Sequence, residues 1–193
     1  MGFPGGLIFG SGKLIILYNK FRKTAEAKEQ EQGAWHGAGG GFETDFWKDA
    51  NLRKVWDDIV PGEPRKAIPY TLTREAIELY CKSVGEDHPI YFDEAYAKTT
   101  RYGGLIAPPS IHILLMFSCT PADDWMRSPG TVNAGQSWSY NIPARPNDVI
   151  TLQARALDKF IKRERLFVVH DNVFFNQKGD VICSGRGWTI RPM

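Results

Sequence analysis

Cysteine is scarce in this chain of 193 residues, which has only three. Cys81, Cys119 and Cys183 are an odd number at wide spacing, so they argue against a disulfide framework and favour reduced thiols in a cytoplasmic setting. No CxxC or HxxxH pair occurs, and the histidines are scattered along the chain: His36, His88, His112 and His170. We therefore expect no metal site.

Long apolar runs are also lacking. The most apolar stretch lies near the N-terminus, where residues 10–13 separate two short hydrophobic segments. Neither segment approaches the roughly 20 residues of a membrane-spanning helix. The stretch has no charged start and no A-x-A cleavage site, so we expect neither a membrane span nor a signal peptide.

An excess of one charge sign is missing as well, because 24 Lys and Arg residues stand against 22 Asp and Glu residues. A net charge of +2 is too small for the basic surface of a nucleic-acid-binding protein. With 42% hydrophobic and 24% charged residues, the composition is that of a soluble globular protein, and the chain is long enough to bury a core.

The chain divides at a glycine-rich joint, where residues 37–41 contain four glycines in five positions. We expect residues 1–41 to be an N-terminal extension, either a packing arm or a poorly ordered tail. Residues 42–193 are predicted to be the folded domain. No internal repeat is visible, so we expect a single structural unit.

Besides a short helix within residues 44–59, which ends before Pro61-Gly62, two helices are predicted in the first half of this domain. Thr73 is a suitable N-cap for a helix that buries Ile77, Tyr80, Cys81 and Val84 on one stripe and ends at Gly85. Residues 111–117 are apolar almost all round, which predicts a helix buried on every side. Two prolines open this second helix, and Ser110 is expected to help cap it.

The rest of the chain is predicted to be strands. Residues 149–156 alternate between apolar and polar side chains, and residues 166–175 are apolar on both faces, as in a central strand. Residues 181–190 carry a strip of small side chains on one face, which would let a helix lie close. A curved antiparallel sheet wrapped around a central buried helix, an α+β fold, is the economical assembly.

Titratable groups are concentrated in the loop that follows the first helix. Residues 85–93 read Gly-Glu-Asp-His-Pro-Ile-Tyr-Phe-Asp and place an acid, an imidazole and a phenol next to a core element. A small enzyme that keeps acid and base groups in a half-dry groove would need such an arrangement.

This order of parts resembles the MaoC-like acyl-CoA hydratases and dehydratases, which have the hot-dog fold. The family carries the loop pattern G-D-x-N-P-[IL]-H, and Gly85, Pro89 and Ile90 match it. The resemblance continues from roughly residue 61 to residue 192 in four further segments: Gly103 to Ala107, Ala134-Gly135, Arg145-Pro146-x-Asp148 and Asn176-Gln177-x-Gly179. The pairing of Pro89-Ile90-Tyr91 with an Ala-Pro-Pro run points to the N-terminal, or FAS1-like, dehydratase branch.

Departures from the loop pattern fall on the reactive positions. Glu86 stands where the family has Asp, His88 where it has Asn, and Tyr91 where it has His. The resemblance implies that these three are the candidate catalytic residues. Glu86 would be the general base, but its extra methylene moves the carboxylate by about a bond length, which catalytic geometry tolerates poorly. Tyr91 holds its proton at neutral pH, and nothing in the sequence shows that His88 faces inward.

Further candidates would bind the substrate. The resemblance implies that Gly103, Gly104, Ala107 and Ser110 line the thioester site, although Pro109 takes the place of a glycine whose N–H helps the family to form an oxyanion hole. Lys162 and Arg163 belong to a basic run that would either meet coenzyme A phosphates or form a solvated hairpin end. His112 is predicted to be a hydrogen-bonded core histidine.

Three functions remain open for such a chain. In the first, the chain is a component of a hydro-lyase of fatty acid metabolism and shares its groove with a catalytic hot-dog partner. In the second, it is a self-sufficient hydratase that uses Glu86 with Tyr91 or His88. Alternatively, it is a non-catalytic acyl-CoA-binding or assembly subunit. The resemblance implies an acyl-CoA or acyl-ACP ligand, no redox cofactor or metal, and a homo-oligomer or heteromer.

Overall fold

The computed structural model describes residues 50–192. The predicted extension of residues 1–41 and the boundary that follows it lie outside the described residues. In the described part, no helix is long and apolar enough to cross a membrane. The helices are α2 (Leu52–Asp57), α3 (Arg74–Val84), α4 (Glu94–Thr99) and α5 (His112–Ser118), and the strands are β1 (Tyr70–Leu72), β2 (Val132–Tyr140), β3 (Asp148–Lys162), β4 (Arg165–Phe175) and β5 (Val181–Pro192).

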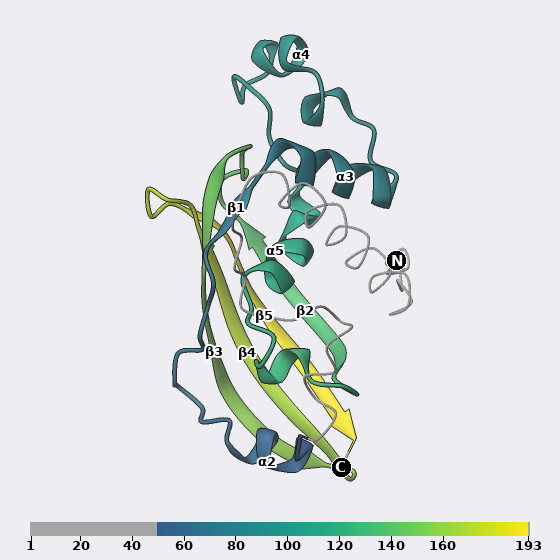
Figure 1. Cartoon of the computed structure of the whole chain (residues 1–193), viewed down its shortest axis with the longest axis vertical. Helices are drawn as coiled ribbons and strands as arrows, with labels where there is room; N and C mark the ends of the chain where they lie inside the picture. Colours follow the sequence, from purple (N-terminus) through teal and green to yellow (C-terminus); the bar gives the residue numbers. More distant parts are fainter. Residues whose placement is uncertain (1–49, 193) are drawn as a thin grey trace, which may run out of the picture. The chain divides into compact units, whose positions relative to one another are not determined.

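The strands form one antiparallel sheet of five strands in the order β1-β3-β4-β5-β2, with α5 lying against its inner, curved face (Figure 1). Alternate residues of β3 are buried from Asp148 to Ala156, as the sequence pattern predicts. β4 lies between β3 and β5, so the expectation of a central strand is also confirmed. This α+β assembly confirms the predicted hot-dog fold.

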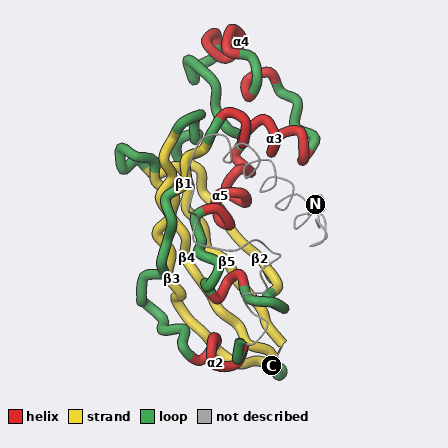
Figure 2. Tube along the Cα trace, in the orientation of Figure 1, coloured by secondary structure: helices red, strands yellow, loops and turns green. Residues whose placement is uncertain are grey.

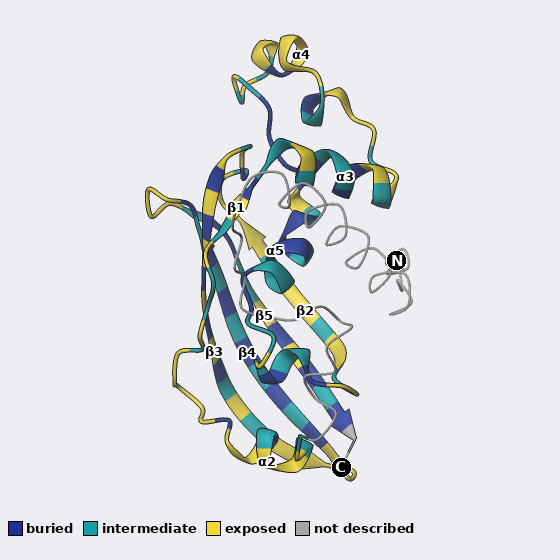
Figure 3. Ribbon diagram, viewed as in Figure 1, coloured by how far each residue is buried: buried dark blue, intermediate teal, exposed yellow. Residues whose placement is uncertain are grey.

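Helix α5 is less enclosed than the sequence predicts. Ile111, Leu114 and Leu115 are buried, but Ile113 and Met116 are only half-buried. The prediction of burial on every side is therefore wrong, because a helix on one face of a sheet contacts it along one stripe only (Figure 3). The Ser110 side chain makes no capping hydrogen bond either.

The small residues of β5 make room for aromatic side chains, not directly for α5. A Cβ atom at Gly185 would lie 2.4 Å from the ring of Trp138 on β2. A Cβ atom at Gly187 would lie 2.5 Å from the ring of His170 on β4. The predicted direct packing of α5 on this strip is wrong, because these two rings occupy the space between the glycines and the helix layer.

The predicted first helix has the expected ends. The Thr73 side chain accepts a hydrogen bond from the Ala76 N–H, and Gly85 ends the helix in the left-handed conformation at φ 76°. Ile77, Tyr80 and Cys81 are buried, whereas Val84 is exposed.

Different elements contact the two ends of β3, β1 at one end and α2 at the other (Figure 2). At its first residue, β3 pairs with β1, which leads directly into α3. Toward its last residue, the Lys159 ammonium donates to the Trp56 and Asp57 carbonyls of α2. About 15 residues of extended chain, roughly 45 Å along the strand, therefore separate the loop after α3 from the turn after Lys162.

Candidate functional site

The loop after α3 is held by its own hydrogen bonds. The Glu86 N–H donates to the Cys81 carbonyl, and a Glu86 carboxylate oxygen accepts from the His88 N–H at 3.4 Å. His88 Nδ1 accepts from the Ile90 N–H at 3.2 Å and caps a short 3-10 turn over Pro89–Tyr91. In its neutral form, the exposed His88 ring therefore carries its proton on Nε2. Among the described residues, no hydrogen bond joins the Glu86 carboxylate to this ring.

Tyr91 lies at the border between this loop and the core. It packs against the buried cluster that contains Ile90 and Leu105 and is itself half-buried. Burial raises the pKa of the Tyr91 phenol, and the nearby Glu86 carboxylate raises it further. The His88 and Tyr91 ring centroids are 6.0 Å apart. The structure thus brings all three candidate catalytic residues onto one loop, but not into one hydrogen-bonded chain.

The glycine segment after the loop is fixed by Arg145. The Arg145 guanidinium donates to the Tyr102 carbonyl at 2.6 Å and to the Leu105 carbonyl at 3.5 Å. A Cβ atom at Gly104 would lie 3.6 Å from this guanidinium, and Gly103 has a left-handed φ of 66°. Gly103 therefore has a structural reason to be there, the left-handed backbone of a turn clamped by Arg145, whereas a Cβ atom at Gly104 would make only an ordinary contact.

Two family-like motifs that are distant in sequence meet in space. The Arg145 N–H donates to one Asp148 carboxylate oxygen at 2.7 Å, and the Gln177 amide donates to the other at 3.2 Å. Asp148 is buried, so both of its oxygens need such donors. The Ala107 N–H is also committed within the fold, to the Ala144 carbonyl at 2.8 Å. The Asp148 carboxylate and the Ala107 N–H are thus committed to contacts within the fold.

A second pair of titratable groups lies at the entry of α5. His112 Nδ1 is 3.0 Å from the Pro109 carbonyl oxygen and 3.1 Å from the Tyr140 hydroxyl. The ring packs on Trp138 with centroids 4.2 Å apart, and its buried Nε2 atom has no hydrogen-bond partner. Burial lowers the pKa of His112, so the ring is neutral. The prediction of a hydrogen-bonded core histidine is confirmed.

Sequence reasoning did not identify Tyr140 as the partner of His112. Tyr140 is the last residue of β2, and its exposed side chain reaches the helix entry only because β2 pairs with β5 beneath α5. Beside this pair, the Tyr80 hydroxyl donates to the Ser110 carbonyl at 2.8 Å. Ser110 therefore lies at the helix entry, and its backbone carbonyl accepts this hydrogen bond. No local signal in the sequence reveals either contact.

Lys162 and Arg163 are not part of this group within one chain. Both are exposed at the turn that joins β3 to β4, where Arg163 and Glu164 have left-handed φ values of 51° and 56°. This turn is at the far end of β3 from the loop that holds Glu86.

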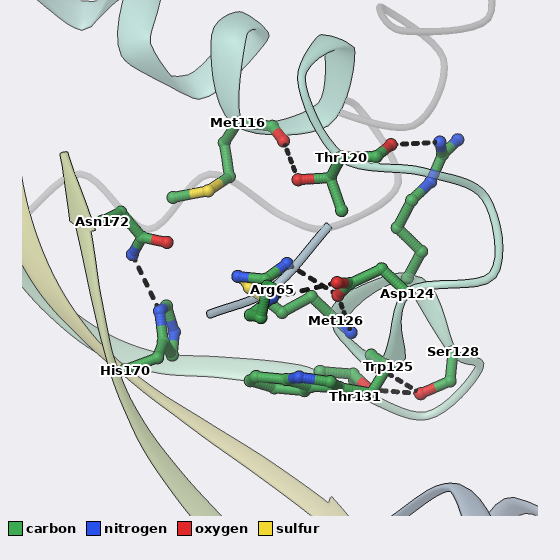
Figure 4. Close-up of polar contacts among 11 residues, drawn as sticks. Arg65, Met116, Thr120, Asp124, Trp125, Met126, Ser128, Thr131, His170 and Asn172 are labelled. Atoms are coloured by element: carbon green, nitrogen blue, oxygen red, sulfur yellow. Dashed lines mark hydrogen bonds and ion pairs between the residues drawn. The ribbon is translucent and has the colours of Figure 1, made fainter. Parts of the chain in front are cut away.

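A buried polar cluster lies under the C-terminal end of α5 (Figure 4). Arg65 forms an ion pair with Asp124 at 2.6 Å, with both side chains almost fully buried, and stacks over Trp125. The His170 ring meets the edge of Trp125 and accepts at Nδ1 from the Asn172 amide at 2.8 Å. Burial, together with the Arg65 charge, lowers the pKa of His170 to about 4. The sequence analysis did not predict this cluster.

Metal-binding groups are absent from the described region, since residues 50–192 hold no set of three His, Cys, Asp or Glu side chains that could bind an ion. The cysteines there are not disulfide-bonded. Burial raises the pKa of the Cys81 thiol to about 11 and of the Cys119 thiol to about 12, so both are protonated and unreactive at neutral pH.

Comparisons with known proteins match this geometry. The profile of the FAS1-like dehydratase domain region matches residues 60–184. A UPF0336 protein of Thermobifida fusca is 30% identical over 97 residues, which cover 47% of this chain and 62% of the relative. The match thus spans less than two thirds of that relative's own length.

Solved structures share the fold at low sequence identity. The (R)-hydratase PhaJ1 of Pseudomonas aeruginosa is 22% identical, with a TM-score of 0.60 over 71% of this chain and 84% of that chain. The HadBC (3R-hydroxyacyl-ACP dehydratase) complex of Mycobacterium tuberculosis is 20% identical, with a TM-score of 0.58 over 68% of this chain and 96% of that chain. Because the matching profile spans more than half of the sequence, this chain belongs to the family of the FAS1-like dehydratase domain region.

Proposed function

We propose that this chain is a subunit of an enoyl-thioester hydratase or 3-hydroxyacyl-thioester dehydratase. It would bind an acyl-CoA or acyl-ACP in a groove shared with a second hot-dog subunit. The reaction would be reversible addition of water across a trans-2-enoyl thioester, by acid–base chemistry and without a redox cofactor or metal.

The observation that carries this proposal is the missing carboxylate–imidazole pair. The Glu86 carboxylate is bonded to the backbone of His88 and not to its ring, while His88 Nδ1 is occupied by the Ile90 N–H. Tyr91 has a raised pKa and holds its proton more firmly than a free phenol does. A loop with these contacts is a poor proton shuttle, so a partner subunit would supply the acid and base.

A heteromeric assembly is consistent with one of the compared structures. The mycobacterial dehydratase of the same fold is described as a HadBC complex, which has two different components. In such an arrangement, the present chain contributes the apolar environment of its α5 entry and the partner contributes the chemistry.

A self-sufficient hydratase is the second candidate function. It is favoured by the closeness of the Glu86 carboxylate to the Tyr91 phenol, whose pKa that carboxylate helps to raise. A non-catalytic acyl-CoA-binding or assembly subunit is the third candidate, and it would bind the thioester without turnover.

Hydration of crotonyl-CoA by the purified chain distinguishes these functions. We expect very weak turnover by the chain alone, and substantial turnover after addition of the hot-dog subunit that co-purifies with it, identified by native mass spectrometry of material from the source organism. Glu86→Gln and Tyr91→Phe should then leave the turnover of the assembly largely intact, like the control Asp87→Asn on the same loop.

Two outcomes would reject the shared-groove proposal. Strong turnover by the chain alone that is lost in Glu86→Gln or Tyr91→Phe would establish the self-sufficient hydratase. Binding of crotonyl-CoA with no turnover in any assembly would establish the non-catalytic subunit.

A further inference from the structure

A phenol hydroxyl, that of Tyr140, lies at the entry of α5. Tyr140 is the last residue of β2, and strand alternation places its side chain on the same face of the sheet as that of Trp138. Its hydroxyl oxygen is 3.1 Å from Nδ1 of His112, the first residue of α5. Tyr140 is 50% exposed, so a ligand can approach this side chain from solvent.

The proton of the neutral His112 ring is on Nδ1. This atom lies 3.0 Å from the Pro109 carbonyl oxygen, which can only accept a hydrogen bond, so Nδ1 must be the donor. Nε2 then carries no proton, and it is the ring atom that has no hydrogen-bond partner. Because a protonated Nδ1 cannot accept a hydrogen bond, the Tyr140 oxygen accepts from the ring and does not donate to it.

The O–H group of Tyr140 is therefore free to donate to another acceptor. Within residues 50–192, the Tyr140 hydroxyl has no hydrogen-bond partner other than the His112 ring. Burial raises the pKa of the Tyr140 phenol, so the phenol keeps its proton at neutral pH. The helix entry thus presents a protonated phenol whose oxygen is held in place by His112.

Other groups at the helix entry are less suited to donate to a ligand. The Tyr80 hydroxyl donates to the Ser110 carbonyl at 2.8 Å, and the Ile111 N–H donates to the carbonyl three residues earlier at 2.9 Å. Pro109 has no N–H. Of these groups and Tyr140, only the Tyr140 O–H remains for the oxygen of a ligand.

The surroundings of the Tyr140 hydroxyl favour a neutral carbonyl as its acceptor. The His112 ring packs on Trp138 with centroids 4.2 Å apart, and Trp138 stacks on the buried Phe174 with centroids 6.0 Å apart. In such an aromatic environment, a hydrogen bond is stronger than in water. The imidazole and the phenol are both neutral, so the pair offers no positive charge to an anion.

We propose that the Tyr140 hydroxyl binds the carbonyl oxygen of the acyl thioester, and that His112 is its positioning residue. This inference rests on the proposed function, from which it takes the acyl thioester as the ligand. It adds a residue of this chain that touches the substrate, next to an acid and a base from the partner subunit.

The role of such a hydrogen bond follows from the electron flow of hydration. The base of the partner takes one proton from water, the water oxygen bonds to C3, and the C2=C3 electron pair moves toward the carbonyl oxygen. As the C=O bond re-forms, the acid of the partner returns one proton to C2. Tyr140 keeps its own proton throughout and stabilises the negative charge that develops on the carbonyl oxygen.

Infrared difference spectroscopy of butyryl-CoA, isotope-labelled at the carbonyl carbon, tests this contact. Butyryl-CoA has no C2=C3 double bond, so it binds to the chain, alone or with its co-purifying subunit, without being hydrated. We expect binding to the wild type to lower the carbonyl stretching frequency, because a hydrogen bond weakens the C=O bond. Tyr140→Phe should still bind the compound but lose this shift. Ser139→Ala, an exposed neighbour on the opposite face of β2, should keep it.

Turnover of crotonyl-CoA by the assembly is a second measurement. Tyr140→Phe should lower kcat about 100-fold and change KM less, because the hydrogen bond strengthens as charge develops on the oxygen. His112→Asn keeps an N–H donor near the position of Nδ1, so it should retain more activity than His112→Leu. Circular dichroism of each variant shows whether it is folded.

Two outcomes would overturn the inference, and they are distinguishable. If the wild type and Tyr140→Phe bind butyryl-CoA with the same carbonyl frequency, the carbonyl contacts another group and only this inference fails. If butyryl-CoA binds neither to the wild-type chain nor to its assembly, the inference and the proposed function fail together.

Discussion

At the scale of single residues, the interior of the protein contains two polar side chains that tolerate burial in different ways. Arg65 forms an ion pair with Asp124 at 2.6 Å, and its guanidinium lies over the Trp125 ring. His170 is neutral instead, because burial and the Arg65 charge lower its pKa to about 4. Each solution has a measurable consequence for stability.

The buried His170 should make the protein acid-sensitive. An unfolded histidine titrates at a pKa of about 6.5, whereas His170 in the folded state titrates at about 4. The unfolded state therefore binds more protons in this window, and the stability present above pH 6.5 is lost as the pH falls toward 4, by about 3 kcal/mol in total. Denaturant unfolding between pH 4 and pH 7 measures this loss.

Two substitutions check the origin of this acid sensitivity. His170→Gln should reduce the slope of stability against pH, since it removes the titrating group. His88→Gln is the matched control, because it removes an exposed histidine that lies outside the buried cluster of His170. An identical slope in wild type and His170→Gln would show that other groups cause the acid sensitivity.

The Arg65–Asp124 pair should be costly to break from one side. Asp124→Ala leaves the Arg65 guanidinium buried and unpaired, so we expect a loss of about 3–5 kcal/mol in the free energy of unfolding. Asp58→Ala breaks the exposed Lys54–Asp58 pair and should cost at most about 1 kcal/mol. Urea unfolding of the two variants measures the difference, and equal losses would contradict the burial argument.

At the scale of elements, the glycines of β5 decide how the sheet and α5 fit together. Trp138 from β2 lies over Gly185, and His112 of α5 packs on Trp138 with ring centroids 4.2 Å apart. Because Gly185 has no Cβ atom, the Trp138 ring can lie close to β5, and this sets the distance between β5 and α5.

Gly185→Ala should disturb this layer. The new Cβ would lie 2.4 Å from two ring atoms of Trp138 and 2.8 Å from the Ser137 carbonyl oxygen, so the Trp138 ring has to move. Overpacking of this kind costs about 1–3 kcal/mol, which lowers the melting temperature of a chain of this size by roughly 2–4 °C per kcal/mol. Calorimetry and tryptophan fluorescence would report both effects.

Gly135→Ala is the control on a neighbouring strand. Its Cβ would lie 3.5 Å from Trp188, an ordinary contact, so we expect little change in melting temperature. A neutral Gly185→Ala variant would show that the Trp138 ring is not confined between β5 and the helix layer.

At the scale of the whole molecule, β2 is the edge of the sheet formed by residues 50–192. Within these residues it pairs only with β5, and most of its residues are exposed, including Val132 at 57% and Tyr140 at 50%. The outer side of α5 is only half-buried as well. Exposed strand edges and apolar surfaces favour association with another chain.

We therefore expect the protein to form a stable oligomer. Sedimentation should show an assembly larger than one chain at micromolar concentration, and the melting temperature should rise with protein concentration because association stabilises the folded state. A folded monomer at micromolar concentration, with a melting temperature independent of concentration, would contradict this expectation.

Local sequence patterns were sufficient to predict most of the fold. The alternation in β3, the Thr73 cap and the Gly85 stop are properties of neighbouring residues, and each is present in the structure. The family resemblance likewise located the loop that holds Glu86, His88 and Tyr91. Such features depend on side-chain periodicity and backbone preference, which are encoded within a few positions of the chain.

Contacts between distant segments decided the rest. The position of Tyr140 beside His112 depends on strand pairing, and that of Arg65 beside Asp124 joins residues 59 positions apart. The separation of Arg163 from the loop that holds Glu86 depends on the length and direction of β3. The burial of Arg191 depends on the residues that pack over the end of β5. A local pattern carries little information about such contacts, because they form only when the sheet closes around the helix.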